Sequence, residues 1–324
     1  MKRSSIRLCS VAVCFLVVFL QRSQATGFVF TTIDFPGSAC TQAFGINDSG
    51  QIVGLYNTFN PSCGGQPDHG FLLDSGTFTT IDNPGSSLTQ PNAISSSSEI
   101  TGFCEGDGCG IGASFLRDTG GNFNVFEFPG SCSTIANGIN SSAAQIVGSY
   151  TSTCSGSNHG FLLAGSNFSP VDFPGSQSNE ANGINNAGDI VGTYGTSGPF
   201  IENHGYLFSG GSFITSDVPG AILTRAEGIN DPPSKTIVGV YVDTGGASHG
   251  YVLAGGNFIT IDVPGAISTV ATKINNKGQI VGYYQDSTGQ FSWLPGSTVT
   301  VRRKLRDRVE FQWHGNSGWR FHLV

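Results

Sequence analysis

The sequence predicts an all-β protein, a six-bladed β-propeller made of four-stranded repeats of about 45 residues. The first observation is a motif that begins with Phe and ends in Pro-Gly, with its Phe at positions 30, 78, 123, 168, 213 and 258. The second is that each unit holds four short segments rich in β-branched and aromatic residues, separated by Gly, Asn, Ser and Pro. The third is the lack of helical periodicity after residue 25. Repeated sets of four short antiparallel strands are typical of propeller blades.

Within each unit the segments follow a fixed order, which we name strands A to D. Strand A ends in Gly-Ile-Asn, strand B contains Ile-Val-Gly, strand C begins with His-Gly, and strand D carries the Phe motif. The chain begins with a strand D alone, at 28–34, and its last repeat has strands A, B and a degenerate strand C at 289–293. We therefore expect the N-terminal strand to complete the last blade, because a closed ring leaves no unpaired sheet edge between the two ends. A β-solenoid is the alternative, although its coils are usually shorter.

Residues 1–25 predict a secretory signal peptide. Three basic residues among the first seven precede an apolar run from Val11 to Leu20, and small residues follow it. The run is shorter than the roughly 20 apolar residues that a membrane-spanning helix needs. We expect a secreted, extracellular or periplasmic monomer with no transmembrane segment after signal removal, in which residues 26–296 form the propeller.

The two parts of the chain that follow the signal differ in charge. Residues 26–296 hold five basic and 20 acidic residues, whereas residues 297–324 hold six basic and two acidic ones. The acidic propeller argues against nucleic acid as a partner, since phosphate binding needs a basic face. The basic C-terminal segment breaks the repeat and predicts an appendage that is disordered or forms a hairpin. A surface-binding arm for anionic glycans or lipids is the alternative for it.

The cysteines predict three disulfide bonds, because six remain after the signal and an even number is usual in exported chains. In two repeats one cysteine follows a Pro-Gly-Ser turn and another lies in the loop between strands B and C. A third repeat carries two cysteines in that loop. The predicted pairs are Cys40–Cys63, Cys132–Cys154 and Cys104–Cys109. A metal site is the alternative, but no Cys-x-x-Cys or His-x-x-x-His spacing exists, so we predict no metal and no cofactor.

A histidine begins strand C in four repeats, and an aspartate follows it 13 residues later in strand D. This spacing across a tight turn places the two side chains opposite each other. The pairs are His69–Asp82, His159–Asp172, His204–Asp217 and His249–Asp262. A shared metal ion is excluded because strand C lies two strands from the axis, at about 4.8 Å per strand. We predict a structural hydrogen bond in each repeat.

The repeats resemble those of an extracellular protein family named for a His-Ala-Phe motif, the HAF family. The resemblance rests on His-Gly-Phe or His-Gly-Tyr in strand C and on the Gly-Ile-Asn and Ile-Val-Gly segments, which together cover nearly all of 28–294. Gly stands where the family motif has Ala. The resemblance implies export and a repeat architecture, and it implies no established activity.

Function is expected where the repeats differ. The B–C and D–A loops share one face, and strand A begins there, nearest the axis. Two positions of strand A vary from repeat to repeat. The first column is Gln42, Gln90, Ile135, Glu180, Arg225 and Val270; the second is Phe44, Asn92, Asn137, Asn182, Glu227 and Thr272. The charges in these columns are Glu180, Arg225 and Glu227, which predict a polar ligand pocket on the axis. A solvated salt-bridge cluster is the alternative.

Two classes of function remain open. The first is a non-catalytic binding module that uses this loop face for an extracellular glycan or protein. The second is an extracellular hydrolase or lyase acting on a polysaccharide, which would need an acid and a base within reach of each other. Glu180 and Glu227 are the candidates for that pair, and neither lies in a recognisable catalytic motif. We therefore predict a binding module in which no catalytic residue is identified.

Overall fold

The structure is a computed structural model that describes residues 28–59, 68–141, 145–196 and 203–286, and beyond these the backbone of 298–303, 309–313 and 319–323. These residues form strands and turns. No helix among them is long and apolar enough to cross a membrane. The predicted signal peptide lies outside the described residues.

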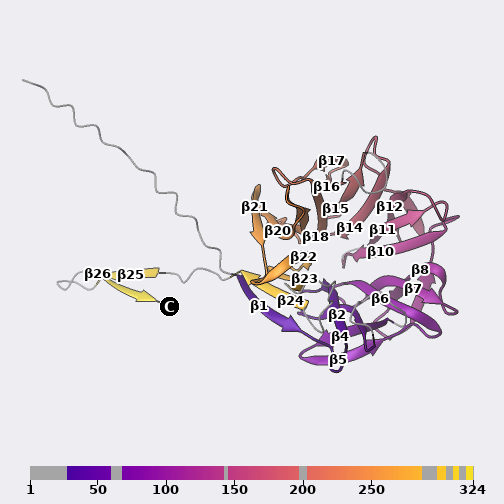
Figure 1. The fold of residues 1–324 in the computed structure, drawn as a ribbon, viewed down its shortest axis with the longest axis horizontal. Coiled ribbons are helices and arrows are strands. Elements are labelled where there is room, and N and C mark those ends of the chain that lie inside the picture. Colours follow the sequence, from indigo (N-terminus) through magenta and orange to yellow (C-terminus); the bar gives the residue numbers. More distant parts are fainter. Residues whose placement is uncertain are drawn as a thin grey trace, which may run out of the picture.

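The strands form a β-propeller, in which antiparallel sheets stand around a central axis with one strand of each unit innermost (Figure 1). Four sheets have four strands each, in chain order. The first sheet consists of β2 (Cys40–Ile46), β3 (Ile52–Asn57), β4 (His69–Asp74) and β5 (Thr77–Ile81). The second sheet consists of β6 (Ser86–Ile94), β7 (Ile100–Gly106), β8 (Gly110–Arg117) and β9 (Phe123–Phe126). The next two are β10 (Ser133–Ile139), β11 (Gln145–Thr151), β12 (Asn158–Ala164) and β13 (Asn167–Pro170), then β14 (Ser178–Ile184), β15 (Ile190–Gly195), β16 (Asn203–Ser209) and β17 (Ser212–Thr215).

The fifth sheet has eight strands and differs from the prediction of separate blades. One half is β18 (Leu223–Ile229), β19 (Ile237–Val242), β20 (Ser248–Ala254) and β21 (Asn257–Ile261); the other is β22 (Ala266–Ile274), β23 (Gln279–Asp286), β24 (Thr298–Arg303) and β1 (Phe28–Ile33). A single parallel pair, Ser248 with Ser268, joins the halves. The structure therefore has five propeller sheets where the sequence predicted six blades, because this bridge merges the last two units.

The outer strands of the second half correct the expected position of strand C. Strand β24 pairs with β23, and β1 pairs antiparallel with β24 from Phe28–Arg303 to Ile33–Thr298. Residues 298–303 thus take the place expected for 289–293, which lies outside the described residues. The alternating Thr and Val of 298–301 favour a strand. Six residues of the predicted appendage therefore belong to the sheet, and β25 (Val309–Trp313) and β26 (Trp319–Leu323) form a hairpin beyond it.

The Gly-Ile-Asn motif ends four of the inner strands and begins their A–B turns, while β6 has Ala-Ile-Ser and β22 has Lys-Ile-Asn in its place. The side-chain oxygen of Asn47 accepts hydrogen bonds from the backbone N–H groups of Ser49 (3.1 Å) and Gln51 (3.0 Å). Gly50, with φ of 85°, takes the left-handed conformation that favours glycine. Asn185 and Asn275 make the same two bonds in their own turns. The side chain of the motif asparagine therefore shapes the turn that reverses the chain.

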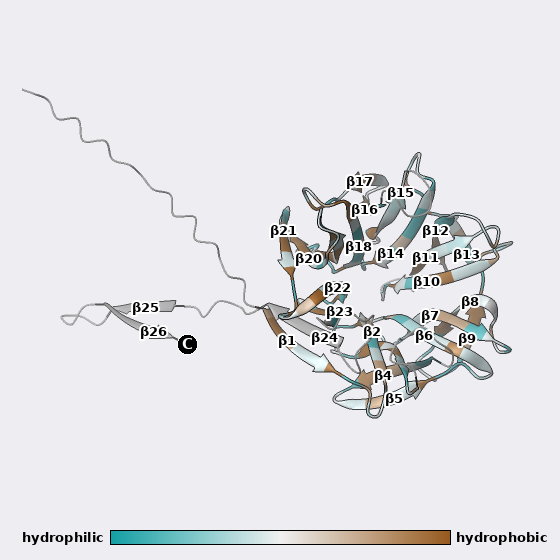
Figure 2. Ribbon diagram, in the orientation of Figure 1, coloured by the Kyte–Doolittle hydropathy of each residue, from teal (hydrophilic) through white to brown (hydrophobic). Residues whose placement is uncertain are grey.

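The core between the sheets contains one fully buried aromatic ring on strand C of each of five units. These rings are Phe71, Phe115, Phe161, Tyr206 and Tyr251. Each lies beside the glycine of Ile-Val-Gly on strand B. At Gly148 a Cβ atom would lie 2.0 Å from the carbonyl oxygen of Ile135 and 2.8 Å from the ring of Phe161, so glycine alone fits. Figure 2 shows hydrophobic stretches in β1, β4 and β21.

Two of these buried rings are tyrosines, which gives a matched pair of substitutions. The hydroxyl of Tyr206 donates to the carbonyl oxygen of Glu180 at 3.2 Å, whereas the hydroxyl of Tyr251 has no hydrogen-bond partner among the described residues. We expect Tyr206→Phe to lower the free energy of unfolding by about 1 kcal/mol, and Tyr251→Phe to leave it unchanged or raise it. Urea denaturation of both variants measures the difference, and equal losses would contradict the expectation.

Candidate functional site

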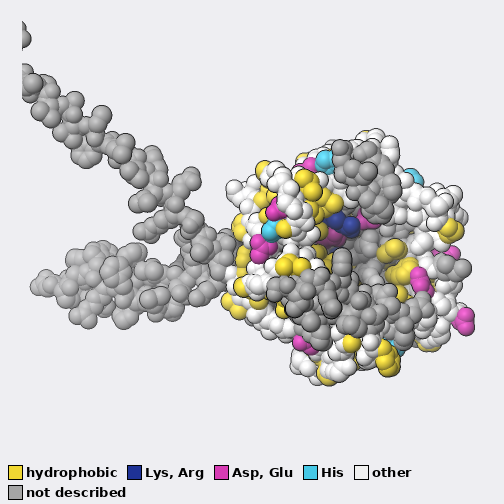
Figure 3. All heavy atoms as spheres, in the orientation of Figure 1, with side chains coloured by type: hydrophobic (Ala, Val, Ile, Leu, Met, Phe, Trp, Pro, Cys, Tyr) yellow, Lys and Arg dark blue, Asp and Glu magenta, His cyan; other side chains and the backbone are white. Residues whose placement is uncertain are grey.

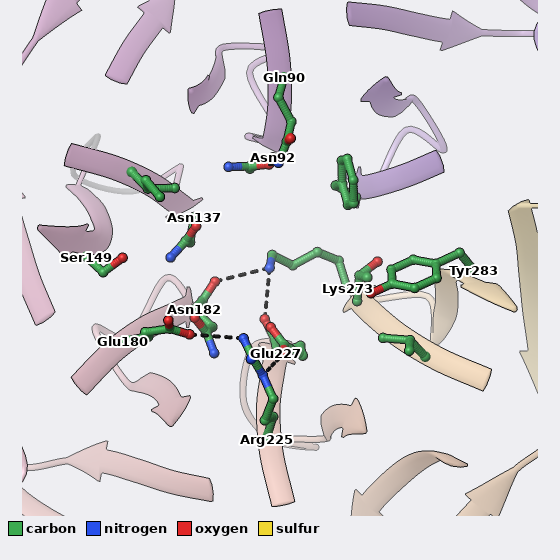
Figure 4. Close-up of a pocket in the computed structure, with 14 residues that line it drawn as sticks. Gln90, Asn92, Asn137, Ser149, Glu180, Asn182, Arg225, Glu227, Lys273 and Tyr283 are labelled. Atoms are coloured by element: carbon green, nitrogen blue, oxygen red, sulfur yellow. Dashed lines mark hydrogen bonds and ion pairs between the residues drawn. The ribbon is translucent and has the colours of Figure 1, made fainter. Parts of the chain in front are cut away.

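A cavity of about 290 Å³ lies on the propeller axis, at the end where the inner strands begin. Figure 4 shows its wall, and Figure 3 shows basic and acidic side chains within the central hollow of the molecule. The wall contains every member of the two variable columns except Gln42. The lining residues are Phe44, Gln90, Asn92, Ile135, Asn137, Ser149, Glu180, Asn182, Arg225, Glu227, Val270, Thr272, Lys273 and Tyr283. The structure thus brings the three predicted charged residues together at one cavity.

The second variable column coincides with a β-bulge in each inner strand. Pairing with strand B shifts by one residue after Ala43, and likewise at the equivalent place in the other inner strands. One residue per unit is left without a partner across the ladder. These residues are Phe44, Asn92, Asn137, Asn182, Glu227 and Thr272. A bulge re-aims the side chain of the extra residue, and all of these side chains line the cavity.

The charged residues form one network across two neighbouring units. Arg225 donates from Nη2 to Glu180 Oε2 and from Nε to Glu227 Oε1, both at 2.9 Å. The other oxygen of Glu180 accepts a hydrogen bond from Asn158 at 2.8 Å. The Glu227 carboxylate raises the pKa of Arg225 above its usual value, although burial opposes this. The guanidinium is therefore committed to two carboxylates and is not a free anion-binding group.

Lys273 is a fourth charged group at the cavity, and the sequence analysis did not identify it. Its amine donates to the carbonyl oxygens of Glu227 (2.8 Å) and Asn182 (3.1 Å), as the dashed lines in Figure 4 show. Burial lowers the pKa of the Lys273 ammonium to about 8, although the charge of Glu227 opposes the shift. The signal was present in the sequence, because Lys replaces the glycine of Gly-Ile-Asn in the last repeat.

Lys273 lies at the floor of the cavity. Beneath it the axis narrows to a void of about 70 Å³, which Lys273 also lines. The wall of this void comes from the small residues and isoleucines of the same motif. They are Gly45, Ala93, Gly138, Gly183, Ile46, Ile94, Ile139, Ile184, Ile229 and Ile274. A layer of isoleucine side chains and of small residues thus separates the cavity from the turns at the opposite end of the axis.

The asparagines of the wall are oriented by hydrogen bonds to the next unit. The side-chain amides of Asn137 and Asn182 donate to the carbonyl oxygens of Ala181 (3.3 Å) and Ala226 (3.1 Å). No donor among the described residues bonds the side-chain oxygen of either asparagine. Each is therefore an acceptor that remains available to a ligand in the cavity.

Ser149 and Tyr283 share one repeat position, which the sequence analysis also missed. Both stand directly after the Gly of Ile-Val-Gly, where the other units have Leu55, Phe103, Thr193 and Val240. This is a third variable column, and two of its members reach the cavity. Burial raises the pKa of the Tyr283 phenol, so its hydroxyl stays protonated and can donate at neutral pH.

The predicted histidine–aspartate pairs are in contact, and none of them lines the cavity. The Nδ1–carboxylate distances are 2.8 Å for His69–Asp82, 3.1 Å for His159–Asp172, 2.8 Å for His204–Asp217 and 2.9 Å for His249–Asp262. In three pairs the second carboxylate oxygen accepts the backbone N–H that follows the histidine. Each aspartate thus ties strand D to the start of strand C, which is a structural arrangement.

Two of the predicted disulfides, Cys104–Cys109 and Cys132–Cys154, are confirmed. Cys40 is disulfide-bonded, while its predicted partner Cys63 lies outside the described residues. Cys132–Cys154 ties the start of β10 to the loop after β11, on the face where the cavity lies. No group of three metal-ligating side chains occurs within the described part of the chain.

No protein-family model matches this chain, and no curated protein does. Among solved structures it is similar to virginiamycin B lyase from Staphylococcus aureus, with 10% identity over 85% of this chain and 99% of that one and a TM-score of 0.46. It is also similar to a mutant of the Aleuria aurantia lectin in complex with Fucalpha1-6GlcNAc, with 12% identity, coverage of 91% and 97%, and a TM-score of 0.49. AofleA from Arthrobotrys oligospora gives 12% identity, coverage of 92% and 90%, and a TM-score of 0.49. Likeness at this level carries no argument about function.

The lowered pKa of Lys273 predicts a pH dependence of stability. The ordinary lysine pKa of 10.5 falls to about 8 in the fold. Folding therefore favours the neutral amine, and this contribution is present above the ordinary value and is lost as pH falls through about 8. We expect the free energy of unfolding to rise between about pH 8 and 10, by roughly 3 kcal/mol at most.

Chemical denaturation at several pH values measures this rise in the native chain and in Lys273→Met, which should lack it. The exposed Lys277→Met is the control and should keep it. If the native chain and Lys273→Met have the same slope, Lys273 does not carry the effect.

Proposed function

We propose that this protein is a secreted, non-catalytic binding module that holds a neutral polyhydroxylated ligand, such as one sugar residue of a glycan, in the axial cavity. The observation that carries the proposal is the mixture of hydrogen-bonding groups and paired charges on the cavity wall. Asn137 and Asn182 offer acceptors, and Ser149 offers a hydroxyl group. A sugar hydroxyl both donates and accepts, so it fits such a wall.

Charge and size support the same ligand class. Arg225 is paired with Glu180 and Glu227, so its guanidinium is not free to bind an anionic ligand. The aromatic rings of Phe44 and Tyr283 stand near each other, with centroids 6.5 Å apart, and supply apolar surface for the C–H groups of a sugar ring. The volume of about 290 Å³ is near the lower end of the range for small-ligand pockets. It therefore suits one sugar residue better than a protein segment.

The alternative of a polysaccharide hydrolase or lyase has less support. Glu180 and Glu227 were the candidates for an acid–base pair, and Arg225 binds an oxygen of each at 2.9 Å. A general acid must carry a transferable proton toward the substrate, and a carboxylate that accepts from a guanidinium is poorly placed for this. Binding without catalysis accounts for the arrangement more simply.

Export and closure of the ring belong to the same proposal. The disulfides accord with an oxidising compartment outside the cytoplasm and with membership of the HAF-type extracellular repeat proteins. We propose that β22, β23, β24 and β1 act as a sixth blade. Thr272 Oγ1 donates to the carbonyl oxygen of Ala43, and Asn275 Nδ2 to that of Asn47, although about 228 residues separate the partners. These bonds repeat the pattern that links neighbouring units elsewhere.

A glycan array followed by calorimetric titration tests the binding function. We expect a defined set of glycans to bind and Ser149→Val to weaken binding at least about tenfold, because a hydroxyl is lost and a methyl group enters the cavity wall. Valine already stands at the equivalent position 240, so the fold should tolerate it. Val240→Ala is the control, since Val240 occupies the same repeat position without lining the cavity and its side chain makes no hydrogen bond to the wall. A native chain that binds no glycan, or an unchanged affinity in Ser149→Val, would contradict the proposal.

A truncation tests the sixth blade. Phe28, Phe30, Ile33 and Phe35 pack into the hydrophobic clusters of the last and first units. Deleting residues 28–35 should therefore lower the free energy of unfolding by several kcal/mol, on the order of about 1.5–3 kcal/mol per buried side chain, and expose a sheet edge. Deleting 309–324, which lies beyond the paired strands, is the control. Thermal melts compare the two, and a larger loss from the C-terminal deletion would refute closure by β1.

A further inference from the structure

Lys273 differs from the other lysines of the propeller in its surroundings. Its amine lies at the floor of the axial cavity, with two backbone carbonyl oxygens within 2.8 and 3.1 Å. Lys235 pairs with Asp189 at 3.0 Å, and Lys277 is exposed on a turn. Neither of those lysines lines the cavity, so Lys273 is the amine that a ligand there would meet.

The hydrogen bonds of Lys273 leave one position on its nitrogen without a partner among the described residues. A neutral amine has two N–H groups and one lone pair, and the carbonyl oxygens of Asn182 and Glu227 accept both N–H groups. The lone pair then points away from the two carbonyls. Burial also lowers the pKa of the ammonium, which increases the fraction of neutral amine at physiological pH. A desolvated lysine of this kind is the usual nucleophile toward carbonyl groups.

We propose that Lys273 captures small hydroxy-aldehydes, such as the open-chain form of a reducing sugar, as an imine at the floor of the axial cavity. This rests on the proposed function, because the acceptors and hydroxyl groups of the wall would hold the hydroxyl groups of the same ligand. Asn137, Asn182 and Ser149 line the cavity together with Lys273. An aldehyde that carries hydroxyl groups can therefore be held by the wall while its carbonyl carbon meets the amine.

The reaction needs no oxidant or reductant. The nitrogen lone pair forms a bond to the carbonyl carbon as the π electrons of the C=O bond move to oxygen. One proton passes from nitrogen to that oxygen, which gives a carbinolamine. The C–O bond then breaks, hydroxide leaves as water with a proton from solvent, and the remaining N–H proton passes to solvent as the C=N bond forms. One amine and one aldehyde thus give one imine and one water.

Reductive labelling tests the capture. The native protein is treated with glycolaldehyde and sodium cyanoborohydride at about pH 7.5, and the adduct at each lysine is measured by peptide mass spectrometry. We expect Lys273 to be labelled about tenfold faster than Lys277, because the buried amine is neutral far more often. In denaturant this preference should disappear. A native chain in which Lys277 and Lys235 are labelled while Lys273 is not would overturn the inference.

A second variant and a second ligand separate this inference from the proposed function. Lys273→Arg keeps a cation but cannot form an imine under these conditions, so fast incorporation should be lost; unchanged incorporation would overturn the inference. A methyl glycoside cannot open to an aldehyde, so its binding to the native chain reports the proposed function alone. Glycoside binding without labelling of Lys273 refutes only the capture, whereas labelling without glycoside binding refutes only the proposed glycan function.

Discussion

Hydrogen bonds between neighbouring inner strands hold the whole arrangement together. The side-chain amide of the motif asparagine donates to a buried carbonyl oxygen of the next unit, as Asn47 does to Ser95 (3.0 Å) and Asn185 to Asn230 (3.2 Å). A buried carbonyl without a partner is costly, so each unit completes the hydrogen bonding of its neighbour. Because the same hydrogen bond recurs between neighbouring units, it holds their inner strands at a similar separation around the axis. The motif asparagines therefore contribute to the spacing of the inner strands around the cavity.

The polar wall of the cavity depends on this fixed frame. Each inner strand carries a bulge at the same repeat position, and this bulge turns one side chain per unit toward the axis. Because Asn137 and Asn182 donate from their side-chain amides to carbonyl oxygens of the next unit, their side-chain oxygens are left to the cavity. Lys273 stands on an inner strand at a position where other units have glycine. A Cβ atom added at Gly228 on the neighbouring inner strand would lie 2.9 Å from the Cα atom of Lys273. The inner strands approach so closely that one long side chain is enough to floor the cavity.

The sequence predicted the strands, the turns and the axial position of the site because these repeat with the motif. The period fixed strand order, and variation against that period located Glu180, Arg225 and Glu227 on neighbouring units. The predicted position of strand C in the last unit, 289–293, was wrong. The strand that pairs with β23 is β24, and its sequence lacks the His-Gly signal that marks strand C in other units. Lys273 was not predicted because its position holds glycine in four of the other units and alanine in the fifth, which is the pattern of a structural position. The bulges were invisible, since a shift of register depends on pairing between strands and leaves no mark in a single strand.

The separation between frame and wall has a consequence for how such a cavity changes over time. Most wall residues stand at the bulge or two positions before it, two units add the residue after Ile-Val-Gly, and none of these lining side chains belongs to the buried aromatic and aliphatic core. A gene built from tandem copies can therefore alter the lining one copy at a time, while the copies around it preserve the ring. The chemistry of the cavity is then the sum of the side chains that the separate units contribute. A charge on one unit can pair with an opposite charge on the next, as Arg225 pairs with Glu180. Recognition of a new ligand then requires a few amino-acid substitutions at wall positions in separate repeats, while the fold stays the same.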